Sequence, residues 1–203
     1  MDTLGRNNFA RLRGTLAGPP VFSHENRQER FYRFPLRAER LSGASDTLNI
    51  LARERLLNET DLTAAPRIEV TGEIRTFNNP SGEGAKLVIS LFARRIALSQ
   101  ETADENLVLL TGTLCKPPIL RRTPLGRDIC DLMIAVNRRY GRSDYLPCLA
   151  WGERAHAAAR WGVGDVVSLT GRMQSRDYRK ALEDGIVQSR TAFEISVMEI
   201  ERT

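Results

Sequence analysis

Residues 11–20 read RLRGTLAGPP and residues 109–118 read LLTGTLCKPP, with a leucine, a Gly-Thr-Leu triplet and Pro-Pro in register. The same shift of 98 residues aligns RLSGASDTLNILA (40–52) with RRYGRSDYLPCLA (138–150), where seven of thirteen positions are identical. A shift that persists through separate segments indicates an internal duplication. The chain therefore contains two copies of one fold, and about 100 residues per copy is a normal domain size.

The duplication predicts two domains, at residues 1–100 and 106–203, joined by the polar, acidic connector SQETADEN (99–106). In FYRFPLRA (31–38) and ICDLMIAV (129–136) apolar residues alternate, which is typical of half-buried strands. The core residues expected from these two strands are Tyr32, Phe34, Leu36, Ala38, Cys130, Leu132, Ile134 and Val136. Further strands are expected in pairs at 8–16 and 107–114, 46–52 and 144–151, 67–76 and 166–174, and 86–96 and 192–200.

One helix is expected at ERAHAAARW (153–161), ended by Gly162, and its counterpart RERLLNETDL (53–62) predicts only a turn or two. Three strands, a helix and two strands follow the order of an OB-fold. We therefore expect an all-β protein with one short helix per repeat, built as two tandem OB-fold five-stranded Greek-key barrels.

The formal net charge is +5, and only three of the 30 basic residues are lysines, at 86, 116 and 180. Arginine stacks on rings and binds phosphate through two hydrogen bonds. A GC-rich genome that favours arginine codons explains the bias equally well, so the charge permits nucleic-acid binding without demonstrating it. The three cysteines form no CxxC pair, which supports neither a disulfide framework nor a zinc site.

Nothing in the sequence predicts an enzyme, a cofactor, a metal site or a small-molecule substrate. The chain has no GxxxxGK[ST] loop and no GxSxG elbow, and its two histidines, His24 and His156, have no paired metal spacing. MDTLGRNNFARLRG lacks the apolar core of a signal peptide, and the longest uncharged apolar stretch is too short to span a bilayer. We expect a cytoplasmic, nucleoid-associated protein.

The segment RRYGRSDYLPCLAW (138–151) places arginines beside aromatic rings. Tyr145, Leu149 and Trp151 share one parity, so they are either a buried strand face or a platform for a flat, negatively charged ligand. Pro147 lies between them and indicates an edge or a bulge. Trp161 closes the expected helix and faces no basic cluster, so it is interpreted as a packing residue.

Residues 107–200 resemble the bacterial single-stranded DNA-binding protein family almost continuously, through LVLLTGTLCKPPILRRTPLGRDICDLMIAVNR, LAWGERAHAAARWGVGDVVSLTGRMQSRDY and SRTAFEISVMEI. The first repeat resembles the family weakly, through its match to the second. The whole chain is similar to the tandem-OB variety, which implies sequence-independent binding and protection of single-stranded DNA in replication, recombination or repair. It also implies a homodimer with four barrels.

The resemblance implies base stacking at four ring positions, and nearby basic residues complete the expected site. The rings are Tyr140, Tyr145, Trp151 and Tyr178, and the basic residues are Arg121, Arg122, Arg138, Arg139, Arg142, Arg154, Arg172, Arg176, Arg179 and Lys180. Trp161 matches none of these stacking positions. Stacking on aromatic rings is indifferent to base identity.

The first repeat carries Ser42, Thr47, Arg53 and Asn79 at the four ring positions, and its own rings are expected largely in the core. We expect the second domain to be the main binding domain, and the first to supply dimerisation or phosphate contacts. The candidates for these contacts are Arg33, Arg37, Arg40, Arg53 and Arg75.

The family usually ends in a disordered acidic tail that recruits replication and repair proteins. This chain ends at VMEIERT, so tail-mediated recruitment is not expected. Two other interpretations stay open: a protein-interaction adaptor of the primosomal OB type, and a protein that binds single-stranded RNA.

Overall fold

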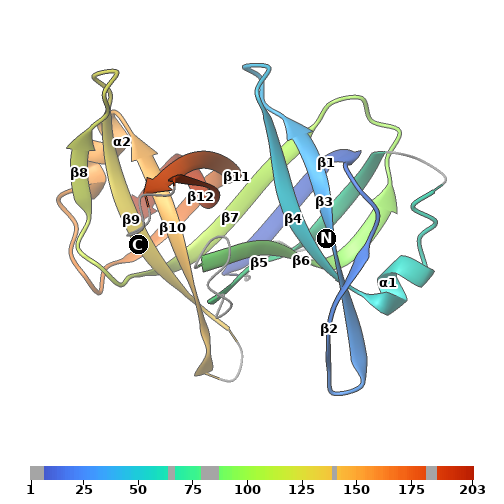
Figure 1. The fold of residues 1–203 in the computed structure, drawn as a ribbon. Helices are drawn as coiled ribbons and strands as arrows, with labels where there is room; N and C mark the ends of the chain where they lie inside the picture. Colours follow the sequence, from blue (N-terminus) through green and yellow to red (C-terminus); the bar gives the residue numbers. More distant parts are fainter. Residues whose placement is uncertain (1–6, 64–66, 79–86, 139–140, 182–186) are drawn as a thin grey trace.

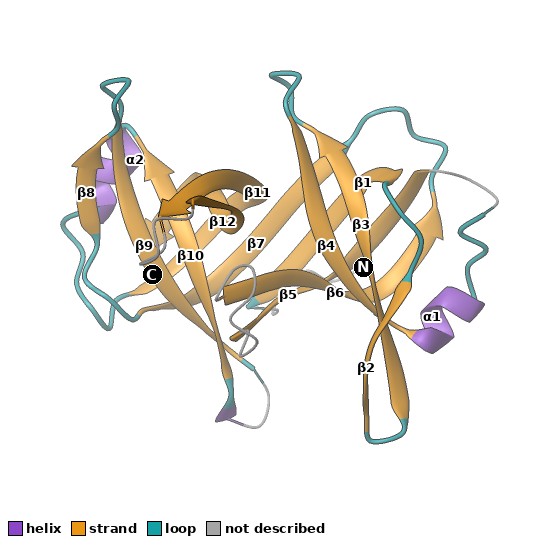
Figure 2. Ribbon diagram, in the orientation of Figure 1, coloured by secondary structure: helices purple, strands orange, loops and turns teal. Residues whose placement is uncertain are grey.

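The computed structural model describes residues 7–63, 67–78, 87–138, 141–181 and 187–203, and only the backbone of 178–181 and 187–190. The elements of the first repeat are β1 (Asn8–Leu16), β2 (Val21–Asn26), β3 (Glu29–Glu39), β4 (Ser45–Arg53), α1 (Glu54–Asn58), β5 (Arg67–Asn78) and β6 (Leu87–Leu98). Those of the second are β7 (Glu105–Leu114), β8 (Ile119–Arg122), β9 (Asp128–Asn137), β10 (Ser143–Trp151), α2 (Glu153–Ala158), β11 (Val166–Ala181) and β12 (Val187–Arg202). Strands dominate both halves (Figure 2).

Each repeat closes into a five-stranded barrel. In the first, the strand order β3-β4-β6-β5-β1 is closed by a pairing of β1 with β3, and only the β4–β6 pairing is parallel. The second repeats this order as β9-β10-β12-β11-β7, closed by β7 with β9. The prediction of two tandem OB-folds is confirmed. The short outer strands β2 and β8 were not expected, and α2 is shorter than the predicted helix.

The glycine of the repeated Gly-Thr-Leu triplet permits this closure. A Cβ on Gly14 would lie 2.1 Å from the carbonyl oxygen of Arg37 in β3, and one on Gly112 would lie 2.6 Å from that of Ala135 in β9. Such distances are far below van der Waals contact, so any side chain here would force β1 away from β3, or β7 from β9. The triplet recurs because both barrels close at this point.

The alternating residues of β3 and β9 lie inside the barrels as predicted, with one exception. Tyr32 is only half-buried. The pairing of β2 with β3 shifts register between Phe22 and His24, and the alternation in β3 is broken beside this shift, so that Phe31 is buried instead. The Tyr32 ring therefore packs edge-on against Phe22, and its hydroxyl donates a hydrogen bond of 2.9 Å to Glu54.

The two barrels share one continuous sheet, because β1 pairs antiparallel with β7 (Figure 1). In this pairing Asn8 lies opposite Leu110, and Leu12 lies opposite Asn106. In the two repeats Asn8 is equivalent to Asn106, and Leu12 is equivalent to Leu110. Exchanging the repeats therefore converts the Asn8–Leu110 pair into the Asn106–Leu12 pair. The barrels are therefore related by an internal two-fold axis that passes between Ala10 and Val108.

No helix in the described part of the chain is long and apolar enough to cross a membrane.

Candidate functional site

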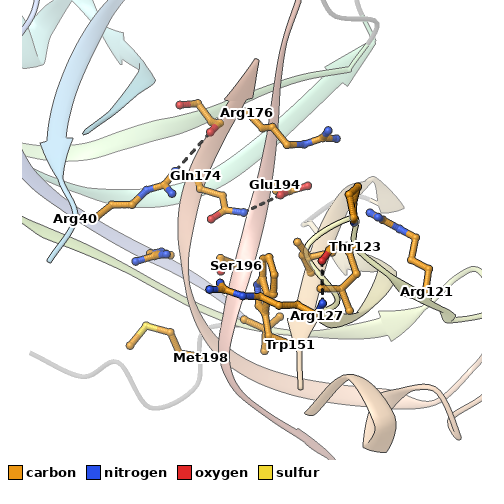
Figure 3. A pocket seen from close by; sticks show the side chains of 16 residues that line it. Arg40, Arg121, Thr123, Arg127, Trp151, Gln174, Arg176, Glu194, Ser196 and Met198 are labelled. Atoms are coloured by element: carbon orange, nitrogen blue, oxygen red, sulfur yellow. Dashed lines mark hydrogen bonds between the residues drawn. The ribbon is translucent and has the colours of Figure 1, made fainter. Parts of the chain in front are cut away.

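A groove of ≈ 720 Å³ lies on the second barrel, among residues of β8 to β12 and the turn at 123–127 (Figure 3). Arg40 of the first barrel also reaches it. Among the described lining residues Glu194 supplies the one carboxylate, and its Oε1 accepts a hydrogen bond of 2.7 Å from the side chain of Gln174. The arginines of the lining are Arg40, Arg121, Arg127, Arg172 and Arg176. The lining is therefore basic, although Arg40 and Arg121 pair with Asp46 and Asp131, which lie outside it.

Trp151 ends β10 and lines this groove half-buried, next to Ile129 and Leu149. The alternation of Tyr145, Leu149 and Trp151 in β10 predicted either a buried strand face or a ligand-binding platform. The structure shows that the three residues differ in exposure. Leu149 is buried, whereas Tyr145 at the other end of the strand is 52% exposed. A half-buried indole on a groove wall has a fixed orientation and an accessible surface, which suits the stacking of a planar ligand.

Two of the groove arginines are available to an anion. Neither Arg127 nor Arg172 makes a side-chain hydrogen bond or ion pair that is seen among the described residues. Both lie in the lining with Trp151, so a ligand stacked on the indole can bring a negative charge to either guanidinium. Arg127 was not predicted from the sequence. The sequence feature that could have identified Arg127 is its position in the turn TPLGR (123–127), which lies between β8 and β9.

Three predicted binding arginines instead pair with buried carboxylates where the barrels meet. Arg40 donates to both oxygens of Asp46, at 2.7 and 2.6 Å. Arg138 likewise holds Asp144, with Nε 2.6 Å from Oδ2, and Arg75 donates to the same oxygen at 2.9 Å. Arg75 also pairs with Glu73, so the charges of these three arginines are largely neutralised within the protein.

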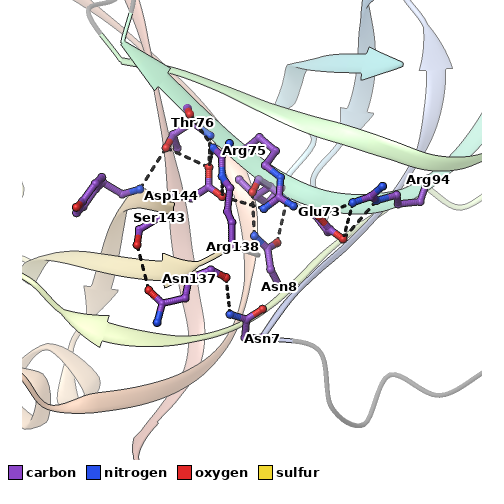
Figure 4. A network of polar contacts seen from close by, with 12 residues as sticks. Asn7, Asn8, Glu73, Arg75, Thr76, Arg94, Asn137, Arg138, Ser143 and Asp144 are labelled. Atoms are coloured by element: carbon purple, nitrogen blue, oxygen red, sulfur yellow. Dashed lines mark hydrogen bonds and ion pairs between the residues drawn. The ribbon is translucent and has the colours of Figure 1, made fainter. Parts of the chain in front are cut away.

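Each of these carboxylates also bridges the two barrels. Asp46 of the first barrel accepts a hydrogen bond of 2.8 Å from the backbone N–H of Ser175 in the second. Asp144 of the second accepts one of 2.6 Å from the backbone N–H of Thr76 in the first (Figure 4). We call these two groups, Arg40–Asp46–Ser175 and Arg138–Asp144–Thr76, the inter-barrel latches.

The electrostatics of one latch can be assigned. Burial raises the pKa of the Asp46 carboxyl, but the hydrogen bonds from Arg40 and Ser175 outweigh burial and hold the pKa below its ordinary value. Asp46 is therefore ionised when the protein is folded at neutral pH, and it attracts the Arg40 guanidinium that reaches the groove.

The other predicted residues fall into three groups. Arg53, Arg121 and Arg122 form ion pairs with Glu29, Asp131 and Asp128. Four exposed arginines have no side-chain partner among the described residues: Arg33, Arg37, Arg142 and Arg154. Tyr140 and Arg139 lie outside the described residues, as do the side chains of Tyr178, Arg179 and Lys180. Of the predicted rings with described side chains, Trp151 lies in the groove and Tyr145 does not.

The rings of the first repeat are less buried than their sequence pattern predicted. Phe22 is 51% exposed, and the guanidinium carbon of Arg30 lies 5.3 Å from its ring centroid. Arg30 is itself paired with Glu54 at 2.9 Å, so the charge of this cluster is neutralised locally. Arg53, at the position equivalent to Trp151, lies 4.8 Å from the Phe92 ring centroid. In the first repeat the Arg53 guanidinium therefore lies over the Phe92 ring, whereas the second repeat has the Trp151 indole at the position of Arg53.

Trp161 packs against the hydrophobic core, as predicted. Pro147 lies in a stretch of β10 that pairs with β9 but not with β12, because the β10–β12 pairing comprises only Cys148 and Leu149.

The chain is similar to known proteins in sequence and in fold. The model of the Single-strand binding protein family matches residues 105–203. The Single-stranded DNA-binding protein B of Bacillus subtilis is 34% identical over 88 residues, which are 40% of this chain and 76% of that protein. For several other relatives, this chain matches only about half of the relative's own length. It covers 58% of the Single-stranded DNA-binding protein 3 of Streptococcus agalactiae, at 32% identity, and 50% of the Single-stranded DNA-binding protein 2 of Listeria innocua, at 35% identity.

A solved structure matches the chain over both repeats. The crystal structure of the wild-type single-stranded DNA binding protein from Thermus aquaticus covers 97% of this chain, with 92% of its own chain matched, a TM-score of 0.76 and 22% identity. A deletion mutant of the same protein gives a TM-score of 0.74 at 23% identity. At this identity the likeness concerns the fold, which is two tandem OB-folds.

Proposed function

Since this chain belongs to the single-strand binding protein family, a non-enzymatic family of DNA-binding proteins, we propose that it binds single-stranded DNA without sequence preference. Bases stack on Trp151, and the groove arginines contact phosphates. The second domain, residues 106–203, is the main binding domain. The activity serves to protect single strands in replication, recombination or repair.

The observation that carries this proposal is the position of Trp151 in the groove with Arg127 and Arg172. Every base offers a ring face, so an indole binds any sequence, and each stacked base contributes roughly 1–3 kcal/mol. A guanidinium binds phosphate oxygens independently of the base. A single strand can turn its bases toward the groove, whereas a duplex keeps them stacked and paired.

The first domain, residues 1–100, is proposed to contribute phosphate contacts or dimerisation. Its exposed arginines Arg33 and Arg37 are candidates for phosphate contacts, because neither has a side-chain partner among the described residues. Arg40, Arg53 and Arg75 are weaker candidates, because each has a carboxylate partner. A homodimer would bring four barrels to one strand, and analytical ultracentrifugation of the free protein tests it.

Tryptophan fluorescence tests the proposed function directly. The chain has two tryptophans, and Trp161 packs against the core, so a Trp161→Phe variant reports on Trp151 alone. Oligo(dT) should quench this fluorescence, and raising the salt should weaken binding, because bound arginines release counterions from the phosphates.

Three further titrations separate the alternatives. Duplex DNA of the same length should give little quenching, and oligo(U) tests whether ribose is accepted. Anisotropy of a labelled oligo(dT) detects binding even where the indole does not respond. Flat anisotropy at low salt would contradict single-strand binding and favour the interaction-adaptor interpretation, whereas preference for oligo(U) would favour an RNA-binding protein.

A further inference from the structure

A second pocket, of ≈ 450 Å³, lies where the two barrels meet. Both barrels contribute to its lining, and the described lining residues include no aspartate or glutamate. The described lining residues are Thr76, Phe77, Asn78 and Leu87 of the first barrel and Lys116, Met133, Ser143 and Tyr145 of the second. We call it the seam pocket.

Two aromatic side chains of the seam pocket are open to solvent. Phe77 and Tyr145 are each 52% exposed, although they come from different barrels and lie 68 positions apart in the chain. Among the described lining residues Lys116 carries the charge, and its ammonium has no described ion-pair partner. The pocket therefore combines two ring surfaces with one positive charge.

The latch next to this pocket fixes the backbone that carries both rings. The Tyr145 N–H donates a hydrogen bond of 3.2 Å to the hydroxyl of Thr76, the residue before Phe77. Thr76 is held in turn by its own N–H to Asp144 at 2.6 Å and by Arg138, which donates to its carbonyl at 2.9 Å. These bonds fix the first barrel's ring relative to the second barrel's.

The internal symmetry provides a comparison within the same chain. At the other latch, Ser175 takes the place of Thr76 and makes the same backbone contact, in this case with Asp46. The equivalents of Phe77 and Tyr145 there are Arg176 and Thr47. The latch thus forms without rings, so packing between the barrels does not require the two exposed aromatics. Exposed apolar surface without a packing role is typical of a binding site.

We propose that the seam pocket is a second base-binding site, in which Phe77 and Tyr145 together hold a base of the single strand and Lys116 contacts a neighbouring phosphate. The proposal rests on the proposed function. Stacking at Tyr145 is what the family resemblance implies, and the proposal adds Phe77 of the first barrel, Lys116 and a site made by both barrels. Stacking on two rings suits a nucleobase, and the uncompensated ammonium suits the phosphate of the same nucleotide chain.

Phe77→Ala tests the seam pocket, with Phe22→Ala as a matched control. Both phenylalanines belong to the first barrel and are about equally exposed, and Phe22 lies outside the seam pocket and the groove. Anisotropy of labelled oligo(dT) should show about tenfold weaker binding for Phe77→Ala and unchanged binding for Phe22→Ala. Thermal unfolding of both variants verifies that they fold.

A double-mutant cycle tests whether the two rings act on the same base. Tyr145→Thr installs the residue that the other repeat has at Thr47, so the fold has already accepted it at the equivalent latch. If both rings hold one base, the loss in the double variant should be smaller than the product of the two single losses. Independent, multiplicative losses would overturn the shared site.

Two other results would overturn the proposal. One is unchanged oligo(dT) affinity for Phe77→Ala, and the other is an equal loss in Phe22→Ala, since the effect would then not belong to the seam pocket. Both differ from failure of the proposed function, in which the wild-type protein itself would not bind oligo(dT).

Discussion

Asp46 and Asp144 stand at equivalent positions in the two repeats, and each accepts a hydrogen bond from a backbone N–H of the opposite barrel. Both side chains are fully buried, and each is held by an arginine six residues earlier in the sequence. A buried carboxylate that pairs with its own barrel and with its neighbour couples the folding of the two. The barrels should therefore behave as one unit.

The first prediction concerns this coupling. Asp144→Ala should lower the free energy of unfolding by about 3–5 kcal/mol, because it leaves the Arg138 guanidinium without its carboxylate in a largely buried setting and removes one of the two carboxylates paired with Arg75. Urea unfolding followed by circular dichroism measures the loss. Asp131→Ala is the control, because the Arg121–Asp131 pair is solvent-exposed and such pairs contribute under about 1 kcal/mol. Equal losses in the two variants would refute the role of the latch.

The second prediction concerns the pH dependence of the other latch. The folded pKa of Asp46 is lowered, so its ionised form stabilises the folded protein above the ordinary pKa of 3.8, and this stabilisation is lost as the pH falls through the folded pKa. Asp46→Asn cannot titrate. The difference in the free energy of unfolding between wild type and Asp46→Asn should therefore be constant near neutral pH and shrink below 3.8. A difference that stays constant down to ~pH 2.5 would contradict the assignment.

The third prediction concerns the closure of the barrels. Gly14→Ala should destabilise the protein by about 1–3 kcal/mol or more, because the new methyl group would overlap the Arg37 carbonyl and separate β1 from β3. Gly162→Ala is the control, because a Cβ at Gly162 meets no atom within 4 Å. The midpoint of thermal unfolding should fall for Gly14→Ala alone. Equal midpoints would mean that β1 can move aside without cost.

The duplication and its strands could be predicted from the sequence, because the strands alternate apolar residues and the repeats serve as a check on each other. The short outer strands could not. β8 is exposed along its whole length and so has no apolar alternation, and the register shift in β2 displaced Tyr32 from the predicted core. In β8 and in the β2–β3 hairpin, the conformation is determined by pairing with a neighbouring strand and not by burial of apolar side chains.

The candidate site was predicted in part. Trp151, Arg172 and Arg40 line one groove, but Arg40 pairs with Asp46, and Arg138 pairs with Asp144 outside the groove. The sequence carried a signal for this pairing, since Arg40–Asp46 and Arg138–Asp144 are identical in the two repeats while the four ring positions differ. Residues that both repeats keep serve the shared fold, and here they hold the barrels together. Tyr145 was predicted as a stacking ring, but its position beside Phe77 was missed, because the two rings come from different repeats and meet only in the folded chain.

The last prediction separates phosphate contacts from general surface charge. Arg172→Gln should weaken oligo(dT) binding and reduce the slope of log affinity against log salt concentration by about 0.7–1, the value for one lost phosphate contact. The reason is that the Arg172 side chain lines the groove with Trp151 and has no described partner to neutralise it. Arg160→Gln removes the same charge from an exposed position outside the groove and should leave the slope unchanged. Affinity measured by anisotropy at a series of salt concentrations gives both slopes, and identical slopes would place the phosphate path outside the groove.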